Sequence, residues 1–316
     1  FDEAQRAWDK GKVERRHKGA VVGSEPDMFI GMANRIPDWG AVVGLIGTGQ
    51  EIHDGEESGL QQWVDAIVNT GEMDNWDIHA PPGIIEQLEI GSIQSYSEPL
   101  LTLNATIRTH FGEMLHHWVD GVLGHVETPY EDISDLYGQL KQSGFKIYYT
   151  SNLRKAKMYL WNRYEKSPDA RYGMICSSRD KSLGGYGMKT LNWPKTLNYG
   201  RWYNESQDHA DSCCALDLAV TEFDSQGLEL DCTLVGWGND FIIQNGKWNN
   251  DRAKRYAYTS EIKDAFTLRR NAYRVLLTRA RDGMILYVPS DELWNETREH
   301  LIKCGIEDLS MVDRDQ

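Results

Sequence analysis

The run YRVLLTRAR near the end of the chain, residues 273–281, combines apolar positions with three arginines. Read as a helix, it places Arg279 on one stripe with Ala272 and Val275, at three- and four-residue spacing. An arginine held on a packed face presents a planar fork of donors that suits phosphate oxygens across a cleft. The pattern is equally typical of a structural arginine in a salt bridge. The run alone leaves both interpretations open.

Two adjacent carboxylates, Asp2 and Glu3, stand in the opening run FDEAQR. Open parallel sheets place their ligand sites where strands end, and a strand ending here would bring both carboxylates to such an edge. An acidic pair is also common in the first turn of a helix, where it compensates the helix dipole.

Three other runs predict strand exits that carry polar residues. GAVVGLIGTGQ, residues 40–50, predicts a short buried strand and a Gly-rich turn ending at Gln50. The apolar tract 100–107 ends at Arg108, and a strand over 216–220 enters the run TEFDSQGLELD at Thr221. We expect the Gly-Leu-Glu turn of the last run and the strand ends around it to form one rim. That rim, the helix with Arg279 and the Asp2-Glu3 carboxylates should lie at carboxyl edges of strands that face one cleft between two sheets.

In order, these runs resemble motifs of superfamily 1 helicases. The run 273–281 is similar to the V-A-L-T-R-A-R motif, whose arginine finger falls on Arg279. TEFDSQGLELD is similar to the T-x-H-x-x-K-G-L-E-F motif, with Phe223 and Gln226 in place of the usual His and Lys. The QGLELD version joined to YRVLLTRAR is most similar to the Schlafen-type (group 3) DNA/RNA helicase domain. The similarity of pattern extends from Phe1 to about Val288.

The resemblance implies an ATP-driven nucleic-acid translocase or helicase that uses ATP and Mg²⁺. FDEAQR becomes the Walker B motif, in which Asp2 holds the metal, usually through water, and Glu3 activates the attacking water. Gln5 would sense nucleotide or nucleic acid. Gln50 would contact the γ-phosphate. Arg108 would do the same as the Arg of the family's L-x-x-N-Y-R motif, although this chain has two additional residues between Asn104 and Arg108.

The resemblance also implies a single-stranded nucleic acid, DNA or RNA, as partner. Gly227 and Glu229 of the Gly-Leu-Glu turn would contact the nucleotide. Thr221, at the start of the same run, would contact the nucleic acid. Residues 182–204 form an irregular tract rich in Gly, Asn, Trp and Tyr, in which Trp202 and Tyr203 could stack on bases. Aromatic-rich insertions more often fold over their own core.

The elements that position these residues alternate between helix and strand. Helical and apolar runs at 136–142, 145–150, 152–164 and 172–177 predict right-handed parallel crossovers. This alternation predicts a doubly wound α/β sheet, and the resemblance implies two RecA-like parallel-sheet domains. Residues 1–128 are the C-terminal part of the first, incomplete at its N-terminus, and residues 129–316 are the second, with its aromatic-rich insertion near 182–204.

A phosphate-binding loop of the type G-x-x-x-x-G-K-[ST] is absent from the 316 residues. In the helicases that the chain resembles, this loop lies upstream of the Asp-Glu motif, so we expect the chain to start inside a larger parent, which could carry a nuclease or other domain. We expect the chain alone to hydrolyse ATP no faster than background. The alternative is a non-hydrolysing nucleic-acid-binding or regulatory module derived from a helicase.

Composition narrows the class of protein. The formal net charge of −14 argues against coating nucleic acid by bulk electrostatics. Locally, residues 247–281 carry ten Lys or Arg against three acidic residues, which predicts either a phosphate-facing surface or an ordinary basic helix face. Five cysteines without a C-x-x-C pair fit a reducing, cytoplasmic location, and no run approaches the roughly 20 apolar residues of a membrane span.

Overall fold

The computed structural model describes residues 1–18, 20, 22–47, 59–102, 112–190, 197–253 and 264–314. Contacts divide the chain into two compact units, one of Phe1–Thr106 with Tyr256–Leu268 and one of Ile107–Arg255 with Arg269–Gln316. The domain ranges expected from the sequence, divided after residue 128, stay a prediction.

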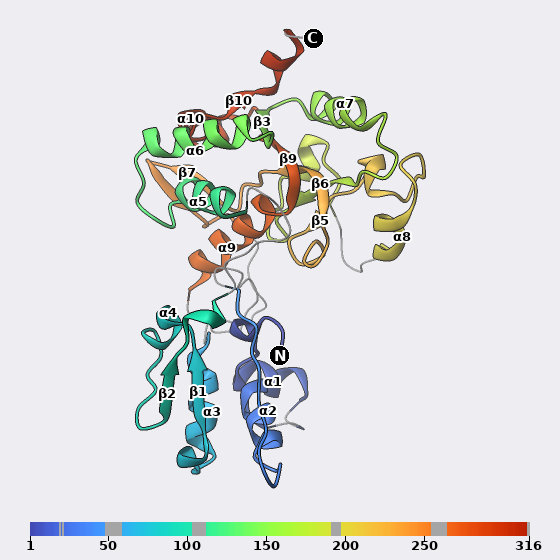
Figure 1. The fold of residues 1–316 in the computed structure, drawn as a ribbon. Coiled ribbons are helices and arrows are strands. Elements are labelled where there is room, and N and C mark those ends of the chain that lie inside the picture. The colour runs from blue at the N-terminus through green and yellow to red at the C-terminus, as the bar shows by residue number, and fades with distance from the viewer. Residues whose placement is uncertain are drawn as a thin grey trace. The chain divides into compact units, whose positions relative to one another are not determined.

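The second unit is built on a six-stranded sheet in which every pair of neighbours is parallel (Figure 1). The strand order is β10-β3-β9-β6-β4-β5. The strands are β3 (Lys146–Thr150), β4 (Tyr172–Cys176), β5 (Val220–Thr221), β6 (Leu230–Gly236), β9 (Ala280–Tyr287) and β10 (Glu307–Asp308). The predicted α/β class with a parallel sheet is confirmed.

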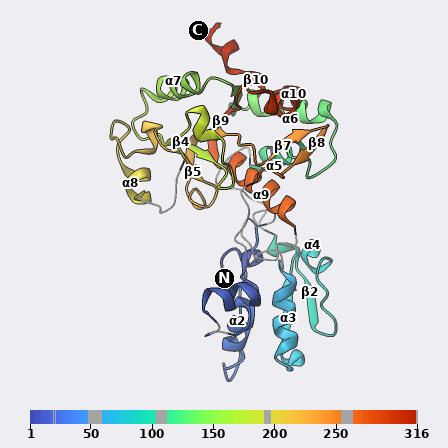
Figure 2. The same ribbon diagram turned by 180° about the vertical axis from the view of Figure 1, so that it is seen from behind.

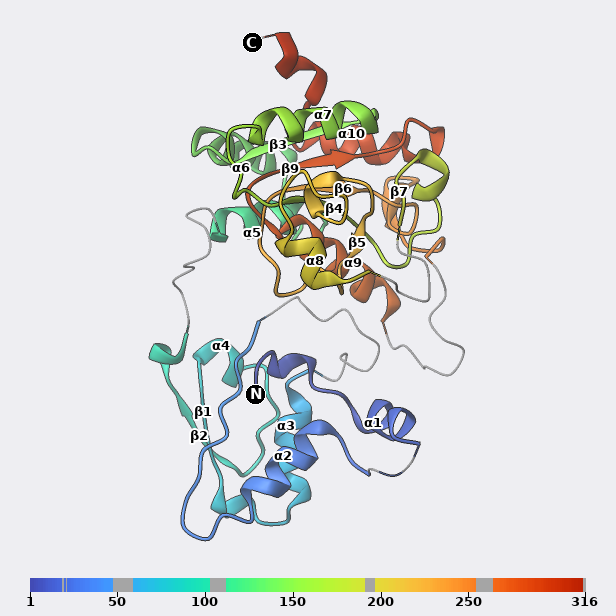
Figure 3. The same cartoon turned by 90° about the vertical axis from the view of Figure 1, so that its right-hand side faces the viewer.

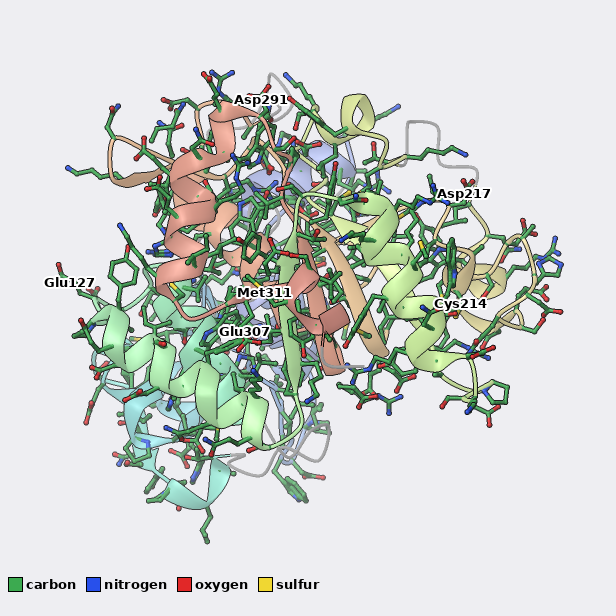
Figure 4. All side chains as sticks on the ribbon, turned by 90° about the horizontal axis from the view of Figure 1, so that it is seen from above. Glu127, Cys214, Asp217, Asp291, Glu307 and Met311 are labelled. Atoms are coloured by element: carbon green, nitrogen blue, oxygen red, sulfur yellow. The ribbon has the colours of Figure 1, made fainter. Side chains whose placement is uncertain are left out.

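Helices cover both faces of this sheet, which explains why its central strands are almost continuously apolar. Figure 4 shows α7 on one side of the strands and α6 with α10 on the other. All five residues of β4 are buried. The helices of the unit are α5 (Gly112–Val122), α6 (Tyr130–Gln142), α7 (Leu153–Tyr164), α8 (Tyr199–Asn204), α9 (Ala265–Leu277), whose first four residues belong to the other unit, and α10 (Asn295–Lys303). An antiparallel hairpin, β7 (Ile242–Gln244) and β8 (Lys247–Asn249), packs against α10.

The first unit joins a short parallel strand pair to helices around a small core. The strands are β1 (Asp77–Ala80) and β2 (Gln94–Ser97), and the helices are α1 (Lys10–Arg16), α2 (Glu25–Ala33), α3 (Gln61–Asn69) and α4 (Pro82–Ile85). α2 begins with a capping box, because Ser24 and Asp27 exchange side-chain to backbone hydrogen bonds. Ile30 of α2 and Val64 of α3 meet in the core of this unit.

Single 3-10 turns connect these elements in both units. They are η1 (Ala4–Arg6), η2 (Met73–Asn75), η3 (Pro99–Leu101), η4 (Leu183–Tyr186), η5 (Cys213–Ala215), η6 (Glu292–Trp294) and η7 (Leu309–Arg314). Within the described residues, every helix is too short or too polar to cross a membrane.

Two predicted strands differ from the structure. The described part of the run 40–50 forms no strand. Val42 is partly buried against the core of the first unit, but Val43 and Leu45 are 64% and 49% exposed. The run hydrogen-bonds the first residue of the chain instead. The strand expected over 216–220 is reduced to Val220–Thr221, because the 3-10 turn at 213–215 ends in Leu216 with a left-handed φ of 51°.

Substitution of Gly283 in β9 tests how closely β9 packs against β3. A Cβ on Gly283 would lie 2.2 Å from the carbonyl oxygen of Lys146 in β3, so Gly283→Ala should lower the free energy of unfolding by about 2–3 kcal/mol or more. Gly138→Ala is the matched control, because Gly138 lies in α6 with no atom near its added methyl group. It should raise stability by about 0.5–1 kcal/mol. Denaturant unfolding of both variants measures the difference, and equal losses would contradict the predicted packing.

Candidate functional site

The carboxylates of Asp2 and Glu3 lie where the first residues of the chain leave an extended pairing. Phe1 N donates to Val43 O at 2.7 Å and Leu45 N donates to Phe1 O at 2.9 Å, a parallel pattern of hydrogen bonds. Glu3 then adopts a left-handed backbone with φ 54°, which is uncommon for a residue with a side chain. The chain turns sharply here, so the two carboxylates stand at the end of the extended segment, as the sequence predicts.

Hydrogen bonds from Gln5 and from two side chains of α3 hold this turn in place. The buried Gln5 donates to Glu3 Oε2 at 2.5 Å and accepts from Gly47 N at 3.0 Å. On α3, Trp63 Nε1 donates to Ala4 O at 2.8 Å and Gln62 Nε2 donates to Ala7 O at 2.6 Å. Gln5 therefore connects the Glu3 carboxylate with the run that leads to Gln50.

The Asp2 carboxylate is placed where it could hold a hydrated magnesium ion. The side chain is exposed, and one of its oxygens accepts a hydrogen bond from Glu3 N at 3.1 Å, the single hydrogen bond to Asp2 oxygens among the described residues. In the described part of the chain, no group of three or more His, Cys, Asp or Glu could hold a metal by itself. The predicted γ-phosphate contacts Gln50 and Arg108 lie outside the described residues.

In the second unit, the run 221–229 forms a loop stabilised by its own side chains. Thr221 is buried, and its backbone N and its hydroxyl both donate to Asp224 Oδ2, at 3.0 and 2.7 Å. Gly227 takes a φ of 78° without a close neighbour, so the turn needs the conformational freedom of glycine. A role of Thr221 toward nucleic acid stays a prediction.

Two tyrosines of α8 hydrogen-bond this loop. Figure 2 shows α8 at the side of the sheet where β5 lies. Tyr199 donates to Asp224 Oδ1 at 2.7 Å, and Tyr203 donates to Glu229 O at 2.8 Å. Trp202 is 2% exposed and lies against Gly173 of β4. This packing matches the alternative in which the insertion folds over its own core, whereas a nucleic-acid role of Trp202 or Tyr203 stays untested.

Arg279 does not share a helical stripe with Ala272 and Val275, so this part of the sequence interpretation is wrong. α9 ends at Leu277, where the Thr278 hydroxyl donates to Arg274 O at 2.8 Å, and Arg279 lies in the link before β9. Its buried guanidinium donates to Leu228 O at 3.4 Å. The two runs that carry the helicase resemblance are thus joined by a direct contact.

Arg279 and the Gly-Leu-Glu turn lie at the amino ends of their strands, contrary to the expected rim of carboxyl ends. Leu230 at the start of β6 pairs with Ala280 at the start of β9, which places Glu229 beside Arg279. Arg281, on β9 itself, pairs with Glu229 and Asp231 at 3.4 and 3.5 Å. The expectation failed because a loop connects the carboxyl end of β5 to the amino end of β6 and carries this turn to the opposite edge of the sheet.

A buried ion network occupies the carboxyl edge. Arg269 of α9 is 1% exposed, and its guanidinium pairs with Glu222 at 2.9 Å and with Asp240 at 3.2 Å, both carboxylates being fully buried. The same guanidinium donates to Ser177 Oγ at 2.7 Å, and Ser177 donates to Asp240. Tyr273, one turn further along α9, donates to Asp240 Oδ1 at 2.8 Å.

The remaining hydrogen-bond capacity of Glu222 is directed at the loop after β4. Ser178 N and its hydroxyl donate to the two Glu222 oxygens at 2.7 and 2.8 Å. Burial raises the pKa of Asp240 above its ordinary value, against the opposing effect of the Arg269 cation. The network therefore joins α9 to the loops that follow β4, β5 and β6.

Most described cations of the basic segment 247–281 serve such internal contacts. Arg274 pairs with Asp120 of α5 at 2.9 Å, and Arg270 donates to Gly124 O at 3.1 Å. With Arg269 and Arg281 in ion pairs as well, this part of the segment is closer to the structural alternative than to a phosphate-facing surface.

The ion network was missed by the sequence interpretation. Arg269 and Asp240 gave no signal, because their pairing joins positions far apart in the chain. Ser177 directly follows β4 and Glu222 directly follows β5, and polar residues at strand ends are the signal that could have identified them.

A family model described as Schlafen group 3, DNA/RNA helicase domain, matches residues 1–290. The match covers both units, including the Asp2-Glu3 turn, the loop 221–229 and Arg279. No curated protein shows significant similarity to the chain.

Removing the Arg269 guanidinium should be strongly destabilising. Arg269→Met leaves two carboxylates buried without their cation, and we expect a loss of about 3–5 kcal/mol in the free energy of unfolding. Arg274→Met on the same helix is the matched control, because Arg274 and Asp120 are 15% and 20% exposed and water can solvate the remaining carboxylate. Denaturant unfolding of both variants checks the prediction, and a smaller loss for Arg269→Met would contradict it.

Proposed function

The chain belongs to the Schlafen group 3 DNA/RNA helicase-domain family, and we propose that it acts as the motor part of an ATP-dependent nucleic-acid translocase or helicase. The membership itself makes the chain a helicase-derived module. ATP hydrolysis and translocation along a single strand are the steps that the proposal adds.

The observation that carries the proposal is the contact between Arg279 and the Gly-Leu-Glu turn. Arg279 is buried in the link between α9 and β9, and the backbone oxygen of Leu228 accepts from it at 3.4 Å. The β6–β9 register and the Tyr203 bond to Glu229 hold this turn in place. A finger arginine needs such a fixed position, because it acts on charge that develops at one point of the transition state.

In the proposed reaction, the chain's own residues supply base, metal contact and cation. Glu3 would accept the proton of the attacking water, and Asp2 would hold a hydrated magnesium ion. Bound Mg²⁺ neutralises charge on the phosphate oxygens. Arg279 stabilises the charge on the transferred phosphoryl group. Gln5, bonded to both Glu3 and Gly47, positions the Glu3 carboxylate.

A P-loop must be supplied for this reaction, since the 316 residues contain no G-x-x-x-x-G-K-[ST] sequence. The same fact favours the second candidate, a non-hydrolysing nucleic-acid-binding or regulatory module. The two candidates separate in a protein that joins this chain to a P-loop. Nucleic-acid-stimulated phosphate release supports the motor, whereas binding of single strands without turnover supports the module. A cytoplasmic location of either form stays a prediction.

Arg279→Ala, in a protein that supplies the P-loop, should lose most stimulated ATPase activity, by about a thousandfold or more. Arg281→Ala should have a mild effect, because Arg281 is 40% exposed and pairs with Glu229 and Asp231 in a surface ion pair worth at most about 1 kcal/mol. Turnover is measured at saturating nucleic acid, with thermal melts to exclude unfolding. Equal, mild losses for the two variants would show that Arg279 is an ordinary structural arginine.

Glu3→Gln, in the same protein, should retain nucleotide binding and abolish turnover, because the amide preserves the shape of the side chain but cannot act as a base. Glu25→Gln is a matched control in the same unit, since Glu25 also accepts a hydrogen bond, from Trp8 N at 2.8 Å. It should keep normal turnover. Nucleotide titration and phosphate release are measured on both variants, and normal turnover by Glu3→Gln would remove Glu3 from the mechanism.

A further inference from the structure

The charge of the first 106 residues is distributed unevenly. They contain seven Lys or Arg against eighteen Asp or Glu, and five of the seven cations stand in the run KGKVERRHK, residues 10–18. In this run Glu14 is the single acidic residue. Residues 51–106 carry eleven acidic residues and no Lys or Arg. A polyanion meets a favourable potential in this part of the chain mainly at residues 10–18.

The structure holds this basic run on the protein by one side and exposes the other. The Asp9 carboxylate caps α1 by accepting from Lys12 N at 2.7 Å, and Val13 is buried. The Lys12 ammonium lies 5.0 Å from the Trp8 ring. Figure 3 shows α1 at the periphery of its unit. Arg15, Arg16, His17 and Lys18 are all exposed.

Nearby carboxylates neutralise this surface only in part. Asp9 is engaged at the helix cap, and Glu14 lies 3.9 Å from the Lys10 ammonium. Within the described residues, Arg16 and Lys18 form no ion pair. These side chains are therefore available to an external anion.

We propose that residues 10–18 form a contact surface for the phosphate backbone of single-stranded nucleic acid. The proposal rests on the proposed function, because it assigns part of the track on which such a motor would move. Arginine forks on a short helix suit phosphate oxygens, and contacts of this kind position a strand without reading its sequence. The acidic composition of residues 51–106 disfavours contact of the strand with that part of the chain.

An acidic protein partner fits the surface less well. Stable protein interfaces have an apolar core surrounded by polar residues. In the run 10–18 the one large apolar side chain is Val13, which is buried against its own unit. A surface that offers charge alone matches a flexible polyanion.

The test compares single-strand binding by the 316-residue chain and two matched variants. The α1 variant, Arg16→Gln/Lys18→Gln, removes the two cations of the run 10–18 that form no ion pair within the described residues. The α7 variant, Arg154→Gln/Lys155→Gln, removes two exposed cations of the other unit. Both variants change the net charge by the same amount and keep good helix formers. Affinities for oligo(dT) and oligo(U) are measured over a range of salt concentrations, with thermal melts to verify folding.

We expect the α1 variant to lose two phosphate contacts. The slope of log K against log salt should become shallower by about 1.4, which corresponds to roughly 25-fold weaker binding near 0.1 M salt. The α7 variant should keep the slope of the unmodified chain. Equal slopes for the two variants, with binding by the unmodified chain intact, would overturn this inference and leave the proposed function standing. Absence of binding by the unmodified chain to either strand would overturn both.

Discussion

The second unit depends on one buried cation, the guanidinium of Arg269. Two carboxylates from different loops, Glu222 and Asp240, are removed from water around it, and each would be costly to bury alone. Geometry makes the arrangement acceptable, because a planar fork satisfies both carboxylates and the Ser177 hydroxyl at once. A lysine would offer a single point charge and could not reproduce this pattern. The network thus sets the position of α9 relative to three strand ends.

From that fixed point, two segments run to the opposite edge of the sheet. One is the part of α9 from Arg269 to the end of the helix at Leu277. The other is the loop 222–229, which leads from Glu222 to the start of β6. Both begin in the ion network and meet again where Arg279 contacts Leu228. The helix rises about 12 Å from Arg269 to Leu277, and Arg279 follows two residues later. The position of the proposed finger is therefore determined at a distance by a group that does not touch the reaction.

The sequence predicted the parts of the fold that depend on local pattern. Apolar runs located β3 and β4 to within a residue at each end. The prediction from sequence failed where the backbone departs from the regular element that the residue pattern indicates. The left-handed conformation of Leu216 shortens a predicted strand, and Arg279 follows the helix rather than lying on it. The candidate site was recognised by resemblance to motifs, but the partners of Arg269 were not, because pairings over 29 to 92 residues leave no periodic signal.

The two edge strands of the six-stranded sheet, β10 and β5, have only two residues each. An edge strand presents unpaired backbone groups to which another chain can add, and the hazard grows with the length of the exposed ladder. Here the long, apolar strands are all internal. β4 has β5 beside its last two residues, and an isolated bridge pairs Thr190 with Ala219, the residue before β5. The sheet is thereby protected against edge-to-edge aggregation, although its central strands are apolar enough to promote it.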